Sequence, residues 1–251
     1  MLDRDGTLVD YAGMFLRFIH ELHREEGLSA PSRDELLGAA YWEAIVSGEL
    51  HLGRVRVRDR VDEVVRRHMP YSGLFPGVPA ALSALAAQGV RLALVSAWVA
   101  TDSTTTLLER HGVRQHFTSV LTRDDLAGHE SGLDDVAAKA ALSRRALAAM
   151  GHEAADRLYV VGDSPADMRL GRLLEAVVVG VRTGNGPRLP TTGPDSPDLM
   201  LPSAAALAPL LLPKAHDDGS GPLPAQSCEG NVPGPKGADS GPGQLPGVPR
   251  G

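Results

Sequence analysis

The sequence is poor in cysteine, aromatic residues and lysine. Cys228 is the single cysteine among 251 residues, aromatic residues make up 4% of the chain, and few of the 25 basic residues are lysines. A single cysteine excludes an internal disulfide and a metal site built from cysteines. No apolar run reaches the ~20 residues that a membrane helix needs, so we expect no membrane-spanning segment.

A strong excess of charge of one sign is missing as well. The 31 acidic and 25 basic residues give a net charge of −6. This balance creates no broad positive field that attracts nucleic acid or an anionic membrane surface, and we expect neither partner. Because the chain opens with MLDRDG, it does not resemble a secretory signal. We expect a cytoplasmic protein, monomeric or homodimeric, that acts on a small molecule.

Short apolar runs alternate with stretches of helical periodicity. The predicted strands cover residues 90–96, 157–161, 176–181 and 199–201, and the predicted helices include 78–88 and 136–150. Gly89 and Gly151 are expected to end these helices. Apolar strands separated by helices are typical of a parallel sheet that is covered on both faces. The predicted fold is therefore α/β, with a Rossmann-like parallel sheet.

Two segments differ from this alternation. Residues 11–72 show helical periodicity and no run that resembles a buried strand, which indicates an α-helical insertion. The sheet domain then consists of residues 1–10 and 73–213. Residues 214–251 are rich in proline and glycine and poor in large apolar side chains. Because such a segment cannot bury enough surface to offset the entropy of ordering it, we predict a disordered tail.

Four aspartates are expected at the carboxyl ends of strands. Asp3 and Asp5 lie two residues apart and are followed by Gly6. Asp163 and Asp167 follow the apolar run at residues 157–161 in the same way. Ligands bind at this edge of an open α/β sheet. Several carboxylates repel one another unless a hard cation lies between them, and Mg²⁺ prefers oxygen ligands. The four residues therefore predict a magnesium site.

These motifs resemble those of the haloacid dehalogenase-like hydrolase superfamily. LDRDGTLVD at the start of the chain, Ser96 at the end of a predicted strand and the later VVGDSPAD stand in the order of the superfamily's motifs. The resemblance implies that Asp3 is the nucleophile, that Asp5 is a general acid and base, and that Ser96 holds the transferred phosphoryl group. It also implies that Asp163 binds Mg²⁺ together with the Asp3 carboxylate and the Asp5 carbonyl. Asp167 belongs to the same metal site and either acts through water or orients Lys139.

The superfamily's remaining motif is a lysine. In many members it stands just after the third strand, where this sequence reads AGHESGLDD without a lysine. Lys139, at the start of the following predicted helix, fits a variant of the pattern and is the single lysine before residue 214. A compact ammonium suits a site where aspartate and phosphate must both be neutralised, and arginine does not replace it. The alternative is a solvated lysine on the surface of a helix.

The resemblance extends over about residues 1–212 and implies that the insertion at 11–72 is a helical cap of the C1 type. Such a cap closes over the substrate. The arginines at alternate positions between residues 54 and 60 either reach a second anionic group of the substrate or form a solvated basic surface. Trp42 either stacks on the substrate or belongs to the core.

The resemblance thus implies a Mg²⁺-dependent phosphatase, similar to phosphoglycolate phosphatase, that acts through an aspartyl-phosphate. Asp5 favours phosphoryl transfer, because a departing alkoxide needs a proton. A phosphomutase of the same superfamily is the second alternative. A catalytically silent binding or scaffold protein is the third, and it rests on the short apolar stretch before Asp3, which leaves the first strand truncated.

Overall fold

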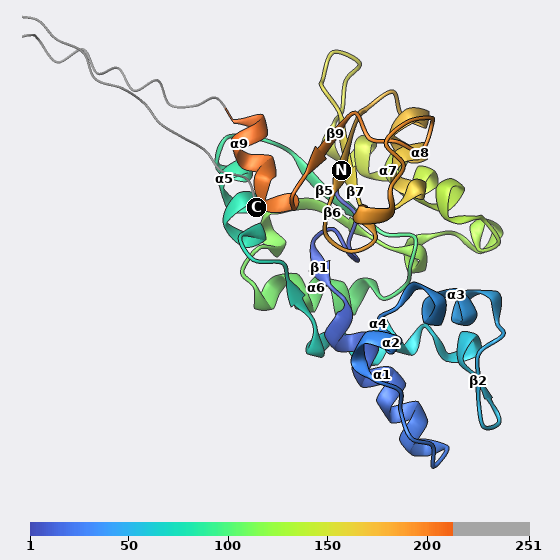
Figure 1. Ribbon diagram of the computed structural model, residues 1–251. Coiled ribbons are helices and arrows are strands. Elements are labelled where there is room, and N and C mark those ends of the chain that lie inside the picture. The colour runs from blue at the N-terminus through green and yellow to red at the C-terminus, as the bar shows by residue number, and fades with distance from the viewer. Residues whose placement is uncertain (213–251) are drawn as a thin grey trace, which may run out of the picture. The chain divides into compact units, whose positions relative to one another are not determined.

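A computed structural model describes residues 1–212 (Figure 1). All of them belong to one compact unit, Met1–Lys214. The tail predicted for residues 214–251 lies outside the described residues, as does Pro213, the last residue assigned to the sheet domain. In the described part of the chain, every helix is too short or too polar to span a membrane.

A parallel sheet forms the centre of the fold. Its strands are β5 (Leu92–Val95), β6 (Phe117–Leu121), β7 (Tyr159–Gly162), β8 (Val177–Val181) and β9 (Leu199–Leu201). β5 pairs with β6, β8 lies between β7 and β9, and all of these pairs are parallel. Leu2 joins the two groups, because it forms parallel bridges to Leu94 and Val161. The predicted α/β fold with a Rossmann-like sheet is confirmed, and β6 is a strand that the sequence analysis did not assign.

The start of the chain lies in the middle of this sheet, between β5 and β7 (Figure 1). The Leu2 N–H donates to the carbonyl of Ala93 over 2.9 Å, and the Asp3 N–H donates to the carbonyl of Val161 over 3.0 Å. These main-chain bonds tie the first residues to the neighbours on both sides. They fix Asp3 at the carboxyl edge of the sheet.

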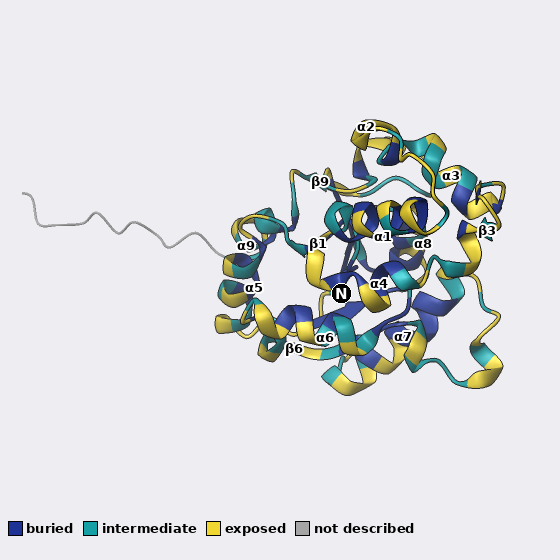
Figure 2. Ribbon diagram, turned by 90° about the horizontal axis from the view of Figure 1, so that it is seen from below, coloured by how far each residue is buried: buried dark blue, intermediate teal, exposed yellow. Residues whose placement is uncertain are grey.

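Helices cover both faces of the sheet. They are α5 (Val78–Ala87), α6 (Thr101–Arg110), α7 (Asp135–Met150), α8 (Pro165–Leu173) and α9 (Leu207–Leu211). Successive side chains of a strand point to opposite faces. Ala93 and Val95 accordingly belong to the buried cluster under α7 and α8, whereas Leu94 belongs to the cluster that includes Leu82 of α5. Figure 2 shows the result, with buried strands and helices whose exposed sides face outward.

The ends of α7 follow the pattern that the sequence predicts. The Asp134 side chain accepts a hydrogen bond from the Ala137 N–H over 2.8 Å and so caps the start of the helix. The helix ends at Gly151, whose φ of +61° is a conformation that glycine adopts without strain. Lys139 therefore lies early in α7, close to the edge of the sheet where Asp3 is found.

The segment of residues 11–72, which we call the cap segment, is largely helical. Its α-helices are α1 (Ala12–Glu25), α2 (Arg33–Leu36), α3 (Ala39–Ser47) and α4 (Glu63–Arg67). One part differs from the all-helical prediction, because β2 (His51–Leu52) and β3 (Val55–Arg56) form a short antiparallel hairpin. The two ends of the cap segment meet, since β1 (Val9–Asp10) pairs with β4 (Gly73–Leu74).

Single turns of 3₁₀ helix complete the described structure. They are η1 (Val57–Arg60), η2 (Met69–Tyr71), η3 (Arg114–His116), η4 (Arg123–Asp125), η5 (Gly128–Glu130), η6 (Gly186–Arg188) and η7 (Ala204–Ala206).

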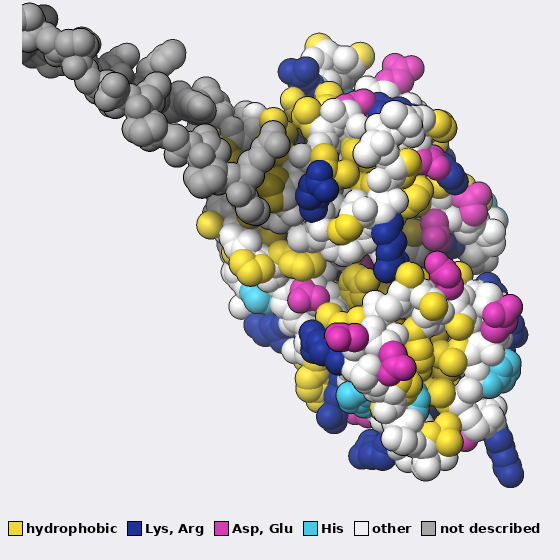
Figure 3. Space-filling view, viewed as in Figure 1, with side chains coloured by type: hydrophobic (Ala, Val, Ile, Leu, Met, Phe, Trp, Pro, Cys, Tyr) yellow, Lys and Arg dark blue, Asp and Glu magenta, His cyan; other side chains and the backbone are white. Residues whose placement is uncertain are grey.

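The cap segment and the sheet domain are in contact. Arg66 of α4 donates two hydrogen bonds to the Asp124 carboxylate, over 2.7 and 3.1 Å. One buried cluster also includes side chains of both parts, such as Phe18 and Leu94. Because this apolar core is shared, the boundaries between sheet domain and cap stay a prediction. On the face drawn in Figure 3, acidic and basic side chains are interspersed, and neither sign forms a broad area.

Candidate active site

The carboxyl edge of the sheet brings together side chains that are far apart in the sequence. Asp3 follows Leu2, Ser96 follows β5 and Asp163 follows β7. Their exposed fractions are 8%, 2% and 2%. The parallel arrangement of these strands explains the meeting, because all of their carboxyl ends lie at the same edge.

Lys139 joins two of the carboxylates. Its ammonium donates to Oδ1 of Asp3 over 2.7 Å and also to Oδ1 of Asp167. Lys139 is 4% exposed and Asp167 is 1% exposed. The side chain is thus buried in the acid cluster, and it is not a solvated lysine on the helix surface. Its second partner is Asp167, the residue to which the resemblance gives either a water-mediated role or the role of orienting this lysine.

Asp167 is held by the start of its own helix. The Ser164 hydroxyl and the Ser164 N–H donate to Oδ2 of Asp167 over 2.6 and 3.1 Å, and the Asp167 N–H bonds back to the hydroxyl. This reciprocal capping box is a local device of the sequence Ser-Pro-Ala-Asp. The capping box leaves Oδ1 of Asp167 free to accept from Lys139. The hydrogen bonds at the start of α8 therefore also position the lysine.

Asp163 is enclosed by backbone. Its Oδ2 accepts a hydrogen bond from the Asn185 N–H over 2.7 Å, and its Oδ1 accepts one from the Thr7 hydroxyl over 3.3 Å. Gly6 and Gly184 have φ values of +79° and +58°, and a Cβ atom at either position overlaps the Asp163 carboxylate. Both positions therefore require glycine, for the backbone conformation and for the close approach.

Burial dominates the electrostatics of the cluster. It raises the pKa of Asp163 to about 7, although the bond from the Asn185 N–H opposes this shift. Burial also raises the pKa of Asp3 well above its ordinary value, and the nearby Lys139 charge opposes it. Burial by itself lowers the pKa of Lys139, but the Asp167 and Asp3 carboxylates outweigh it and the pKa is raised. The single charged ammonium of Lys139 therefore cannot neutralise all of the carboxylates in the cluster.

The residues present fit the predicted magnesium ion. One oxygen atom from each of Asp3, Asp163 and Asp167 lies within 4.8 Å of the other two. A set of buried carboxylate oxygens is the donor set that Mg²⁺ prefers. A further positive charge here also favours the ionised forms of Asp3 and Asp163. The Asp5 carboxylate is not part of this group, and the binding expected of the Asp5 carbonyl stays a prediction.

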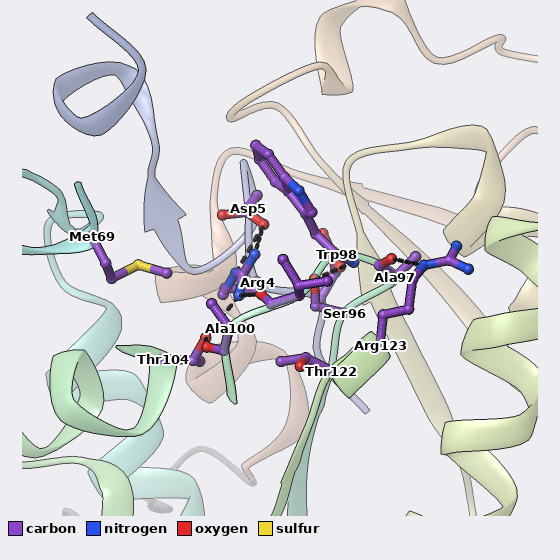
Figure 4. A network of polar contacts seen from close by, with 12 residues as sticks. Arg4, Asp5, Met69, Ser96, Ala97, Trp98, Ala100, Thr104, Thr122 and Arg123 are labelled. Carbon is purple, nitrogen blue, oxygen red and sulfur yellow. Dashed lines mark hydrogen bonds and ion pairs between the residues drawn. The ribbon is translucent and has the colours of Figure 1, made fainter. Parts of the chain in front are cut away.

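The Asp5 carboxylate is turned toward Arg4 instead (Figure 4). The Nε and Nη2 atoms of Arg4 lie 2.8 and 2.7 Å from Oδ2 of Asp5. Arg4 is fully buried, and its Nη1 donates to the Val99 carbonyl over 2.8 Å and to the Thr104 hydroxyl over 2.7 Å. In the described structure, the other carboxylate oxygen of Asp5, Oδ1, is buried without a hydrogen-bond partner.

The Arg4 network holds the loop that connects β5 to α6. Ala100 in this loop has a φ of +82°, which is uncommon for a residue with a Cβ atom. Its N–H donates to Oδ2 of Asp124 over 2.8 Å, and its carbonyl accepts from the Thr104 hydroxyl over 2.7 Å. The same loop starts with Ser96, whose Oγ accepts a hydrogen bond from the Trp98 N–H over 3.2 Å.

A cavity of about 380 Å³ reaches the acid cluster. Its inner end includes Asp3, Ser96 and Lys139. Its outer wall includes Trp98 of the sheet domain and, from the cap segment, Trp42, Arg58 and Asp62. Cap segment and sheet domain thus line one space that ends at Asp3.

The structure brings most of the predicted site residues together. Asp3, Asp163, Asp167 and Lys139 form the cluster, and Ser96 lines the same cavity. Asp5 lies next to the cluster in sequence, but its side chain is bound to Arg4.

Two contributors were not predicted from the sequence. The contact of the Arg4 side chain with Asp5 was not considered, because an arginine between two aspartates gives no sign of complete burial. Trp98 was not considered at all. Its position two residues after Ser96 was an available signal.

A sequence profile described as haloacid dehalogenase-like hydrolase matches residues 1–181. This match covers most of the chain. The chain belongs to the haloacid dehalogenase-like hydrolase family. The resemblance found in the sequence motifs is thereby confirmed. No curated protein sequence matches the chain.

Several solved structures resemble this haloacid dehalogenase-like hydrolase. A predicted phosphoglycolate phosphatase from Haemophilus somnus is 22% identical, with a TM-score of 0.61 over 83% of this chain and 95% of that one. A HAD phosphatase from Thermococcus onnurineus is 19% identical, with a TM-score of 0.56 over 83% and 95%. Protein Tyrosine Kinase A from Mycobacterium tuberculosis is 25% identical, with a TM-score of 0.55 over 73% and 83%.

Proposed function

We propose that this haloacid dehalogenase-like phosphatase hydrolyses phosphomonoesters of small metabolites through an aspartyl-phosphate on Asp3. The observation that carries the proposal is the buried contact of the Lys139 ammonium with Asp3 and Asp167 at the inner end of the cavity. A nucleophilic carboxylate with a fixed cation beside it is suited to attack a phosphoryl group, whose oxygens bring further negative charge.

In the first step, an Asp3 oxygen attacks phosphorus and the bond from phosphorus to the ester oxygen breaks. Asp5 gives a proton to the departing alkoxide. In the second step, Asp5 takes a proton from a water molecule, and the water oxygen attacks phosphorus. The bond between phosphorus and the Asp3 oxygen breaks, which releases phosphate and regenerates the Asp3 carboxylate. Arg4 occupies Oδ2 of Asp5, and Oδ1 is buried without a partner among the described residues. Oδ1 is therefore the atom that we assign to the proton.

Lys139 and Ser96 neutralise and orient the phosphoryl oxygens in both steps. Both side chains are buried, so their charge and hydrogen bond act in a medium where water screens them little. Asp3, Asp163 and Asp167 are the side chains that would hold Mg²⁺. When bound, the ion supplies Lewis-acid stabilisation of charge on the phosphoryl oxygens.

The remaining expectations belong to the same proposal. Residues 1–10 and 73–213 form the catalytic core, and residues 11–72 form the cap that excludes water from the reaction. A cytoplasmic location and a monomeric or homodimeric state stay predictions from the sequence. Two of the reported neighbours carry the word phosphatase in their names, which supports hydrolysis.

The alternatives differ in the acceptor of the phosphoryl group. A phosphomutase returns it to the substrate, and Protein Tyrosine Kinase A is named for transfer to an acceptor other than water. A silent protein binds a phosphorylated ligand without turnover. The carboxylates, the lysine and the serine of the cluster are all present, which favours an active enzyme.

Release of inorganic phosphate separates these reactions. The full chain is incubated with acetyl phosphate and with a panel of metabolite monophosphates, with Mg²⁺ or with excess chelator, and Asp3→Asn is the control. We expect phosphate release that needs both Mg²⁺ and Asp3. Isomerised substrate without net phosphate indicates a mutase, and release that continues unchanged in Asp3→Asn excludes the covalent mechanism.

A further inference from the structure

We propose that the outer wall of the cavity is a ring-binding subsite, so that the preferred substrate is a phosphomonoester of an alcohol that carries a single flat ring. This inference rests on the proposed function, since it concerns the leaving group of the same reaction. The subsite is formed by the side chains that the substrate meets between solvent and Asp3.

Two tryptophans face this space from opposite parts of the fold. Trp98 comes from the loop after β5, and Trp42 comes from α3 of the cap segment. Their ring centroids are 6.0 Å apart with an interplanar angle of 64°, an edge-to-face arrangement. They are the only tryptophans of the chain. A pair of aromatic rings that meets in this way offers both a face and an edge to a third ring.

Both rings are fixed in place. The indole N–H of Trp98 donates to Oδ1 of Asp62 over 2.8 Å, which joins the loop to the cap segment. Trp42 packs edge-to-face on Phe15 of α1 at 5.7 Å between centroids. Figure 4 shows Trp98 extending from the backbone that carries Ser96 and Ala97. Rings held in this way lose little freedom when a ligand binds, which favours recognition by shape.

The outer wall has apolar side chains beside the tryptophans and also carries the charged side chains of Arg58, Asp62, Arg123 and Asp135. Ile45, Val46 and Val61 line the cavity beside the tryptophans, and Val46 is 51% exposed although it is hydrophobic. Together with the two tryptophans, these side chains form the kind of apolar and aromatic lining that is typical of small-molecule sites.

Most of the charged side chains on this wall already have partners within the protein. Asp62 holds Trp98, and Arg123 holds Asp135 over 2.8 Å. Among the described side chains of the wall, Arg58 and the Trp42 indole N–H have no partner. A sugar with several hydroxyl groups would lose its bonds to water here and gain few in return. The wall therefore favours a ring over a polyol.

The size of the cavity limits the ligand. A volume of about 380 Å³ lies near the lower end of the range for small-molecule sites. A phosphoryl group at Asp3 and one ring against the pair of tryptophans fill such a space, and we expect larger ring systems to be excluded.

The test compares 2-phenylethyl phosphate with propyl phosphate. Both are esters of primary alcohols, so their leaving groups differ in the ring and little in acidity. We expect kcat/KM to be about tenfold or more higher for the ring-bearing ester in the wild-type protein. Trp42→Leu and Trp98→Leu should each bring this ratio toward one. Because the ratio is measured within each variant, loss of active protein does not affect it.

Two control variants sharpen the result. Tyr71→Leu removes an exposed aromatic side chain outside the cavity, and it should leave the ratio unchanged. Trp98→Phe keeps a ring but loses the bond to Asp62, and it should keep more of the preference than Trp98→Leu. A wild-type ratio near one, or a high ratio that neither leucine variant lowers, overturns the proposal.

Failure of the proposed function gives a different result. If acetyl phosphate is hydrolysed but the ratio is near one, the ring subsite is wrong and the phosphatase is retained. If no ester is hydrolysed, the ring subsite can still be tested by measuring the binding of phosphonates that are not hydrolysed. Because both tryptophans line the cavity, intrinsic fluorescence reports directly on binding there. 2-Phenylethylphosphonate should then change the fluorescence at concentrations about tenfold lower than propylphosphonate, and equal concentrations overturn the proposal.

Discussion

The inner end of the cavity and its outer wall are built in different ways. The inner end consists of charged side chains that follow parallel strands or start helices, and each of them is buried and has a fixed partner. The outer wall consists mainly of side chains from the cap segment and from the loop after β5, and their exposure ranges from 1% at Ile45 to 51% at Val46. Rigid elements position groups for a reaction that tolerates little displacement. A wall supplied by a separate segment can change its side chains without disturbing that geometry.

Replacement of the nucleophile should give the largest effect. Asp3→Asn keeps the size of the side chain and removes the attacking charge, so we expect activity to fall to background for every substrate. Phosphate release and a thermal melt check the loss and the fold. Asp34→Asn, which changes an exposed aspartate of α2, is the matched control. Retained turnover in Asp3→Asn would show that the inner end of the cavity is not where the reaction takes place.

Removal of the buried ammonium should come next. Lys139→Ala should lower kcat by roughly 10²-fold or more, by analogy with the loss of one preorganised charge-stabilising donor. Lys139→Arg should recover only part of this, because the guanidinium needs more room than the ammonium. Steady-state kinetics on two unrelated esters should give equal losses. Arg144→Ala, on the exposed side of the same helix, should be neutral, and a loss confined to one ester would assign Lys139 to recognition instead.

The pH dependence of stability should be smaller but specific to the inner end. The pKa of Asp163 rises from 3.8 to about 7 on burial, so the folded protein holds a proton that the unfolded chain releases between these values. This stabilisation is complete below about pH 4 and is lost as the pH rises toward 7, by about 1.4 kcal/mol per unit of pKa difference.

Thermal melts of the metal-free protein at pH 5 and pH 8 test this expectation. Relative to Asp163→Asn, the wild type should lose stability at the higher pH. Mg²⁺ should raise the melting temperature more at pH 8 than at pH 5, because the ionised carboxylates bind it. Equal slopes in wild type and variant would show that Asp163 does not titrate in this range.

The contact between cap segment and sheet domain should give the smallest effect. Arg66 and Asp124 form a two-bond ion pair, but their side chains are 49% and 32% exposed. Such pairs contribute about 0.2–1 kcal/mol. Arg66→Gln should therefore lower kcat/KM by less than about fivefold, and high salt should abolish the difference from the wild type. Asp124→Asn should lower kcat/KM more than Arg66→Gln does, because the Asp124 carboxylate also accepts a hydrogen bond from the Ala100 N–H.

The inner end could be predicted from the sequence because each of its residues stands in a short motif tied to a strand or a helix start. The run VRLALVS predicts β5 and places Ser96 at its end, and VVGDSPAD predicts β7, Asp163 and the capping box of Asp167. The structure confirms the fold from which these positions follow. Lys139 followed from its uniqueness and its place in α7.

The outer wall could not be predicted, because its contacts depend on how two distant segments pack. Nothing local to Trp42 or Trp98 indicates that they meet. The hairpin of β2 and β3 was also missed, since strands of two residues are too short to show alternation. β6 reads FTSVL, with only part of its side chains buried, and so lacks the continuous apolar run of the central strands.

The contact between Arg4 and Asp5 limits which substitutions at these two positions can be accepted during evolution. A fully buried guanidinium that loses its carboxylate partner retains an uncompensated charge, at a cost on the order of 3 kcal/mol. A substitution of Asp5 alone is therefore strongly destabilising. A related protein that has lost Asp5 must have replaced Arg4 earlier or at the same time. Among relatives of this chain, an arginine between two such positions should thus be absent wherever the second aspartate has been lost.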